Sequence, residues 1–301
     1  MVAKKEIKIF KFVHPISGDV FTYADKKHSY TLNGKLLAGT TTPIKTYNEP
    51  SWDDDGTMIT ESDIINLWTA KKITESVRED LLALIESGEE LNKTKIEEII
   101  KKSKARPKDV FKDAGLTGTE IHALIEELIK DTILNYNGVI LTGKSPFPQV
   151  DNFIQWAIKN KVKFLFSEEP IYSKDWFNGG TVDFICEIDG KILIGDIKTN
   201  GDKRRYYYNK KTFSYDKTRP QSNIKNKALI QVGAYGKMAT DPEARKLIDK
   251  FDGIVIVNIM KSGEFVEELD VRFNYNTERL IKMFDRIIRN YYDGNELQVK
   301  G

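Results

Sequence analysis

The sequence has one cysteine and no long hydrophobic run, and both absences restrict what the protein can be. Cys186 alone cannot form an intrachain disulfide, and an iron–sulfur cluster or a structural zinc site usually needs three or four ligands of this kind. The longest apolar stretch, residues 254–259, contains Asn258 and is far shorter than the ~20 residues that span a bilayer. The N-terminal residues lack the apolar stretch of a secretory signal. We therefore expect a cytoplasmic protein that does not enter a membrane.

Net charge is also almost absent, but the charges are unevenly distributed. The 301 residues include 47 Lys and Arg against 45 Asp and Glu, a formal charge of +2. Residues 203–227 contain nine basic side chains and one acid, so this segment carries +8 and the rest of the chain −6. With 40% hydrophobic and 31% charged residues, the composition excludes disorder and indicates a soluble globular protein.

The pattern of apolar residues changes along the chain from hairpins to helices to alternating strands and helices. Residues 1–45 alternate around turn signals at 17–19 and 33–34, which predicts two hairpins. Residues 62–105 are helical in period, with Gly88 and Pro107 as breaks, and Thr117–Glu120 has the spacing of a capping box that begins a helix to about Leu134. We then expect strands over 163–172, 181–188, 191–199, 253–260 and 264–272, and helices over 149–160, 222–240 and 276–291. This order predicts an α/β catalytic core over 108–301 and an accessory part over 1–107.

Residues 138–145 have the spelling of a phosphate-binding loop, G-x-x-x-x-G-K-S, but not its context. Such a loop follows a buried strand and opens a helix. Here a helix end precedes it, and Pro146 and Pro148 follow directly. We interpret it as a surface loop and expect no use of ATP.

The most informative stretch is residues 180–199, which reads as a hairpin around the turn Asp189-Gly190. A two-residue turn pairs Ile188 with Lys191, and this register places Asp183 opposite Asp196 with their Cβ atoms about 4.5 to 5.5 Å apart. Strand periodicity adds Lys198 to the same face. Two carboxylates facing each other between apolar residues repel unless a cation lies between them.

This hairpin predicts a metal site that takes Mg²⁺ or Mn²⁺, because the donors are hard oxygens with few thiolates or imidazoles. The ammonium of Lys198 would orient or activate a water and neutralise charge that develops on a phosphate. The alternative is an exposed hairpin on which the three side chains form a solvated ion cluster.

A second candidate lies on the helix that contains residues 118–129. His122 and Glu126 are four residues apart, so they share a face beside the apolar stripe of that helix. A lone histidine at such a position is more often a core or cap residue. Next to a carboxylate hairpin it becomes a candidate metal ligand.

Four motifs together resemble the RecB-type nucleases of the PD-(D/E)XK superfamily, in particular stand-alone phage-type exonucleases without an iron–sulfur cluster. They are GTEIH at 118–122 with Glu126, GGTVD at 179–183, DIKT at 196–199 and QVGAY at 231–235. The resemblance implies a core with a central mixed β-sheet flanked by helices. The chain departs from the family pattern in lacking the proline before Asp183 and in having Asp196 where many members have glutamate.

The resemblance also implies a role for individual residues. His122, Asp183, Asp196 and the carbonyl of Ile197 match the metal ligands, and Lys198 matches the catalytic lysine. Glu126 and Glu168 are implied as carboxylates just outside the ligands. Gln231 and Tyr235 match helix positions that hold DNA near the site; otherwise they belong to an ordinary amphipathic helix.

The +8 segment begins a few residues after Lys198 and also contains five aromatic residues. Cations attract phosphates while rings stack on exposed bases. We expect Arg204, Arg205, Tyr206, Lys210 and Lys211 to bind single-stranded DNA or duplex ends. The alternative is a solubilising loop.

These interpretations predict a Mg²⁺- or Mn²⁺-dependent DNA exonuclease in a bacterial or phage-infected cell, with a place in DNA recombination or repair. A recombination partner, such as a single-strand annealing or binding protein, is a further expectation. Two alternatives stay open: an endonuclease of the same superfamily that acts on branched or specific DNA, and a DNA-binding protein without catalytic activity.

Overall fold

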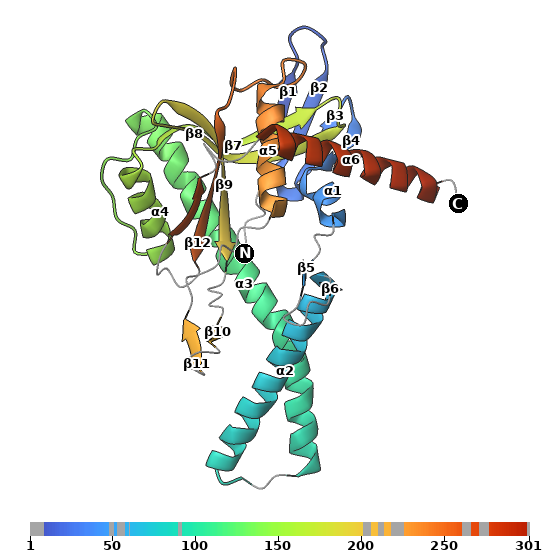
Figure 1. Ribbon diagram of the computed structural model, residues 1–301, viewed down its shortest axis with the longest axis vertical. Helices are drawn as coiled ribbons and strands as arrows, with labels where there is room; N and C mark the ends of the chain where they lie inside the picture. The colour runs from blue at the N-terminus through green and yellow to red at the C-terminus, as the bar shows by residue number, and fades with distance from the viewer. Residues whose placement is uncertain are drawn as a thin grey trace, which may run out of the picture. The chain divides into compact units, whose positions relative to one another are not determined.

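A mixed β-sheet forms the centre of the structure, a computed structural model (Figure 1). The model describes residues 9–47, 51–52, 58–59, 61–89, 92–200, 206–209, 214–217, 226–260, 266–270 and 277–299. Within these residues nine strands join in the order β1-β2-β3-β4-β8-β9-β12-β13, and β7 pairs with β8. The strands are β1 (Ile9–Val13), β2 (Val20–Ala24), β3 (Ser29–Leu32), β4 (Lys35–Gly39), β7 (Lys163–Ser173), β8 (Asn178–Ile188), β9 (Lys191–Asn200), β12 (Gly253–Met260) and β13 (Val266–Asp270). Two of the pairings, β4 with β8 and β9 with β12, are parallel.

Helices cover both faces of the sheet, as the alternation of strands and helices predicts. The end of α3 (Lys93–Tyr136) and α4 (Pro148–Lys159) pack on one face, around Phe153, Phe184 and Val257. On the other face, α5 (Asn226–Thr240) and α6 (Thr277–Val299) pack around Ile185 and Ile256. The expected α/β class is therefore confirmed. No helix in the described ranges combines the length and the apolar character needed to cross a membrane.

The two expected N-terminal hairpins form and extend the sheet through β4. Their aromatic residues make a separate core with Tyr172 of β7, and it includes Phe21, Tyr23 and Tyr30. Short α1 (Thr41–Thr46) follows β4, and a single turn of 3-10 helix (Asp25–Lys27) joins β2 to β3.

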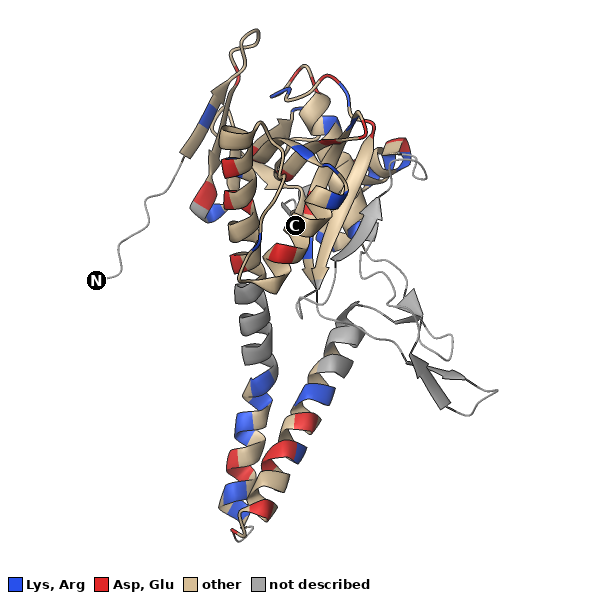
Figure 2. Ribbon diagram, turned by 90° about the vertical axis from the view of Figure 1, so that its left-hand side faces the viewer, with Lys and Arg blue, Asp and Glu red and all other residues tan. Residues whose placement is uncertain are grey.

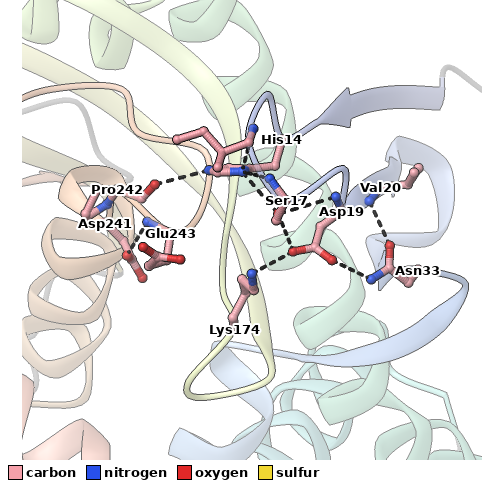
Figure 3. Close-up of polar contacts among 10 residues, drawn as sticks. His14, Ser17, Asp19, Val20, Asn33, Lys174, Asp241, Pro242 and Glu243 are labelled. Carbon is pink, nitrogen blue, oxygen red and sulfur yellow. Dashed lines mark hydrogen bonds and ion pairs between the residues drawn. The ribbon is translucent and has the colours of Figure 1, made fainter.

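The β1–β2 turn is tied to the core by polar contacts (Figure 3). His14 Nε2 lies 3.1 Å from the carbonyl oxygen of Pro242, and its Nδ1 accepts the backbone N–H of Ser17 at 3.1 Å. Asp19 forms an ion pair of 2.6 Å with Lys174. These contacts hold the hairpins in place on the sheet.

Contacts within the chain separate a second compact unit, residues 48–120, from the unit made of residues 1–47 and 121–301. The second unit contains β5 (Ser51–Trp52), β6 (Met58–Ile59), α2 (Glu61–Glu86) and the first part of α3. Charges of both signs line its two helices (Figure 2), and ion pairs such as Lys102–Asp80 join them. Sequence patterns placed the division at residue 107, with the hairpins in the accessory part; by contacts, the hairpins group with residues 121–301.

The helix boundaries expected around residues 107–117 are wrong. α3 continues from Lys93 to Tyr136 through Pro107, and Thr117–Glu120 lies inside this helix rather than at its start. An interior proline removes one backbone hydrogen bond and strains one turn, and neighbouring turns that contain good helix formers such as Lys104, Ala105 and Arg106 can continue the helix despite it. A second difference is the short antiparallel pair β10 (Tyr206–Asn209) and β11 (Ser214–Lys217), which the sequence patterns do not predict.

Gly195 offers a test of the β8–β9 register. It pairs with Phe184, and a Cβ at Gly195 would overlap the Phe184 ring. We expect Gly195→Ala to lower the free energy of unfolding by about 1 to 3 kcal/mol through overpacking. The matched control is Gly294→Ala on α6, where no atom of the described residues lies within 4 Å of the added methyl group and helix propensity favours alanine. Urea denaturation followed by circular dichroism measures both; equal stability of the two variants would contradict this register.

Candidate active site

The candidate site lies where β9 separates from β8. β7 pairs with β8 along its length and takes up one edge of that strand, so β4 and β9 share the other edge. The β9 ladder runs from the pair Ile188–Lys191 to the pair Phe184–Gly195 and ends there, whereas β9 continues beside β12 as far as Asn200. The two strands therefore form a fork that opens at Asp183 and Asp196.

The turn and the register are those that the sequence predicts, but the two aspartates are not a pair of the ladder. Asp183 Oδ2 instead accepts the backbone N–H of Ile197 at 2.8 Å. In a continued ladder, β8 would have accepted the hydrogen bond of this Ile197 N–H group. Here the Asp183 carboxylate accepts it instead, and the bond holds the carboxylate across the mouth of the fork.

Lys198 lies beside the second aspartate. Its Nζ donates a hydrogen bond of 2.8 Å to Asp196 Oδ1 and lies 2.6 Å from Oδ2. The Asp196 side chain is 1% exposed and the Lys198 side chain 32% exposed, so the amine is the part of this pair that reaches solvent. Asp196 Oδ2 is buried, and its close contact among the described residues is this ion pair with Lys198.

Burial dominates the ionisation of these groups. It raises the pKa of Asp196 to about 6 and raises the pKa of Asp183, and the charge of Lys198 opposes both shifts. Burial by itself lowers the pKa of Lys198, but the two carboxylates outweigh it and the net pKa is raised. At neutral pH the amine therefore keeps its proton and pairs with the Asp196 carboxylate.

Glu168 adds a third carboxylate from the neighbouring strand. It lies in the stretch of β7 that pairs with β8 on either side of Asp183, and its φ of 52° is left-handed, an uncommon conformation for glutamate. Burial raises the pKa of Glu168 to about 8, and the negative charge of Asp183 adds to the shift. Such backbone strain is frequent at functional sites.

His122 and Glu126 of α3 face the same region. Burial lowers the pKa of His122, against the opposing effect of Asp196, so its imidazole is neutral at pH 7 and retains a lone pair that can bind a metal. Glu126 forms an ion pair with Lys130, one turn further along α3. Its charge also raises the pKa of Glu168 and Asp183.

Gln231 and Tyr235 of α5 lie on the opposite face of the sheet from α3. Gln231 Nε2 donates to Tyr235 Oη at 2.9 Å. A Cβ at Gly180 would lie 2.5 Å from the Tyr235 ring, so the glycine of β8 lets this ring approach the strand. Tyr235 is buried, and burial raises its pKa, with smaller contributions from the charges of Asp183 and Asp196.

The structure also brings in residues that the motifs do not indicate. Tyr30 of β3 is about 150 residues away in sequence from the β8–β9 hairpin, yet its hydroxyl lies 2.9 Å from Thr181 Oγ1. Glu168 and Asp183 both contribute to raising the pKa of Tyr30. The only local signal was the alternation that predicts the N-terminal hairpins, and alternation does not say where a hairpin packs.

The expected DNA-binding residues of the basic segment lie largely outside the described residues. This holds for Arg204, Arg205, Lys210 and Lys211. Tyr206 is described only as the first residue of β10. The role expected for these residues remains a prediction.

The donors present fit a hard divalent cation. The Asp196 carboxylate is buried and pairs with the partly exposed Lys198 amine, and the half-buried Asp183 carboxylate lies across the fork, so the site offers hard oxygen donors. Asp183, Asp196 and the carbonyl of Ile197 are the donors that would hold the ion. Within the described part of the chain, however, no three His, Cys, Asp or Glu side chains gather closely enough to form a metal cluster by themselves.

No protein-family model matches the chain, and no curated protein matches it either.

The raised pKa of Glu168 predicts a pH-dependent stability. The folded protein keeps the Glu168 proton up to about pH 8, and the unfolded chain loses it near 4.5, so ionisation of this group destabilises the fold as the pH rises between these values. In EDTA, Glu168→Gln should therefore gain stability over wild type progressively from pH 5 to pH 8. Urea denaturation across this range measures the difference. Glu278→Gln on α6, exposed and outside the site, should show a constant difference; a constant difference for Glu168→Gln would contradict the assigned environment.

Proposed function

We propose that this protein is a Mg²⁺- or Mn²⁺-dependent deoxyribonuclease that hydrolyses phosphodiester bonds at DNA ends or in single strands. The observation that supports it most directly is the fork between β8 and β9, where Asp183, Asp196 and Lys198 converge in a partly buried site. The four motifs that resemble RecB-type nucleases all map to this region or to helices that pack on it. An activity of this kind would serve DNA recombination or repair.

The residues of the fork have distinct tasks in this proposal. When bound, the metal would supply Lewis-acid activation of the phosphate and of a water molecule. Asp183 and Asp196 would hold it together with the Ile197 carbonyl, and neutral His122 offers a nitrogen donor. Lys198 keeps its proton at Nζ and stabilises the negative charge that develops on the phosphate oxygens. Glu168 holds a proton near neutral pH, and this limits the negative charge that DNA meets.

Substrate binding is proposed for the +8 segment, whose charge and aromatic residues suit a nucleic-acid strand. The segment begins just after β9 in the sequence. DNA bound to it would therefore lie near Lys198. Gln231 and Tyr235 are proposed to contact DNA on the α5 side.

The central test of the activity is Lys198→Ala. On linear DNA labelled at the 5′ or the 3′ end, wild type with Mn²⁺ should release mononucleotides or short oligomers, and EDTA should stop the release. Lys198→Ala should lower the rate by at least about 10²-fold, because a charge that stabilises the transition state is removed, while DNA binding survives. The matched control is Lys282→Ala, which removes an exposed lysine of α6 and should retain full activity.

A closed DNA circle separates the two nuclease classes. An exonuclease leaves the circle intact and degrades the linear form; cleavage of the circle would favour the endonuclease. Purified wild type that binds oligonucleotides but releases nothing with Mn²⁺ or Mg²⁺ would contradict the nuclease proposal and support a DNA-binding protein.

The basic segment predicts a salt-dependent affinity. Replacing Arg204, Arg205, Lys210 and Lys211 by glutamine should weaken binding of single-stranded DNA and reduce the slope of log K against log salt by about 0.7 for each phosphate that the protein no longer neutralises. Fluorescence anisotropy at several salt concentrations measures this slope. An unchanged slope would indicate that the segment is only a solubilising loop.

A further inference from the structure

The stretch of β8 that carries Asp183 has little support from neighbouring strands on one edge. β4 pairs with β8 only at Asn178 and Gly179, and the ladder with β9 ends at Phe184. In the described strands, residues 180–183 therefore lie between two partners and pair with neither on this edge. Something other than the ladder must hold Asp183 to a defined position there.

Tyr30 provides such a contact. Its hydroxyl lies 2.9 Å from Thr181 Oγ1, and either oxygen can donate the hydrogen bond. Thr181 and Asp183 are two residues apart on a strand, so their side chains lie on the same side of the sheet. The contact therefore holds Thr181, whose side chain is the neighbour of the Asp183 side chain on that side of the strand.

The Tyr30 ring is itself held rigidly. It is 6% exposed and stacks on Tyr23, with ring centroids 5.0 Å apart and planes 15° apart. It also packs directly on the backbone of β8, because a Cβ at Gly179 would lie 2.6 Å from Tyr30 Cβ. Thr40, just after β4, fixes the same part of β8 by donating from its backbone N–H to the Gly179 carbonyl at 2.9 Å.

Polar contacts at the hairpin turns add to this rigidity (Figure 3). Asn33 in the β3–β4 turn donates to Asp19 at 2.8 Å, and Asp19 forms the ion pair with Lys174, in the loop between β7 and β8. The hairpin that carries Tyr30 is thus tied to the start of β8 by two contacts, one through Lys174 in the loop before this strand and one through Thr181.

We propose that Tyr30 is a positioning residue of the proposed nuclease site: its hydroxyl holds Thr181 and thereby fixes the arm of the fork that presents Asp183. The proposal rests on the function proposed above. Tyr30 acts as a hydrogen-bonding group and not as a base, because burial raises its pKa to about 12 and the hydroxyl stays protonated at neutral pH. A displacement of about 1 Å at a reacting group can cost up to about 10²-fold in rate, so one hydrogen bond at this point can affect the rate.

Removal of single hydroxyl groups tests this role. Tyr30→Phe should lower kcat for Mn²⁺-dependent nucleotide release about tenfold, leave KM for DNA ends within about twofold, and weaken Mn²⁺ binding in calorimetry. The matched control is Tyr172→Phe. Tyr172 is also buried and stacks on Phe21 in the same aromatic core, but its hydroxyl has no hydrogen-bond partner among the residues that the structure describes. Removing it should change neither kcat nor Mn²⁺ affinity.

Variants of Thr181 test the pathway of the effect. Thr181→Val should reproduce the loss seen in Tyr30→Phe, and the double variant should be no slower than either single variant, because both remove the same hydrogen bond. Thr181→Ser keeps the hydroxyl and should recover most of the rate lost in Thr181→Val. If Tyr30 has only a structural role, Thr181→Ser should not recover the rate. In that case Tyr30→Phe and Tyr172→Phe should lose similar amounts of activity, in proportion to the decrease in their melting temperatures.

The outcomes separate this proposal from the proposed function. An active wild type with Tyr30→Phe within about twofold of its kcat and Mn²⁺ affinity overturns the role of Tyr30 and leaves the nuclease proposal standing. Additive losses in the double variant also overturn it. A wild type that releases no nucleotides with either metal overturns the nuclease proposal, and the positioning role with it.

Discussion

The hydrogen bond from the Ile197 N–H to the Asp183 carboxylate is the contact on which the candidate site depends. Two antiparallel strands cannot both stay paired and leave room for a substrate between them. Here β9 leaves β8 after Gly195 and continues along β12, and the donor released by this separation is satisfied by a side chain rather than by the departed strand. The opening of the fork therefore leaves this backbone donor satisfied, and the same hydrogen bond positions the Asp183 carboxylate at its mouth.

Charge is the second constraint, and it works against the stability of the fold. Burial raises the pKa of Asp183, Asp196 and Glu168, because it makes the ionised form of each carboxyl group less stable than it is in water. The charge of Lys198 opposes the shifts of Asp183 and Asp196. Carboxylates with raised pKa values beside one amine are typical of functional sites. Because the Asp196 side chain is 1% exposed, the interpretation of the hairpin as a solvated ion cluster is less suitable.

Local sequence signals predicted the parts of the fold that depend on neighbours in the chain. Asp189-Gly190 specified the turn and the β8–β9 register, and alternation located the strands to within a few residues. The signals failed where the helix continued past local boundary signals. Pro107 and the capping-box spacing at Thr117–Glu120 each indicate a helix boundary, but α3 passes through both. Spacing also placed Asp183 opposite Asp196, but it could not show that the ladder ends one pair earlier, because that depends on the pairing of β9 with β12.

The contribution of Tyr30 was beyond reach of any local pattern for a related reason. Its contact with Thr181 exists because β4 pairs with the start of β8, and this pairing requires glycine at position 179, where the Tyr30 ring lies against the strand. Gly179 and Gly180 thus have a packing role that their place in a motif does not reveal: one admits Tyr30 from the hairpin and the other admits Tyr235 from α5. Two aromatic residues from distant parts of the chain approach the same short stretch of β8, just before Asp183. A strand without a ladder partner on one edge is then held by side chains, and only the assembled sheet brings those side chains to it.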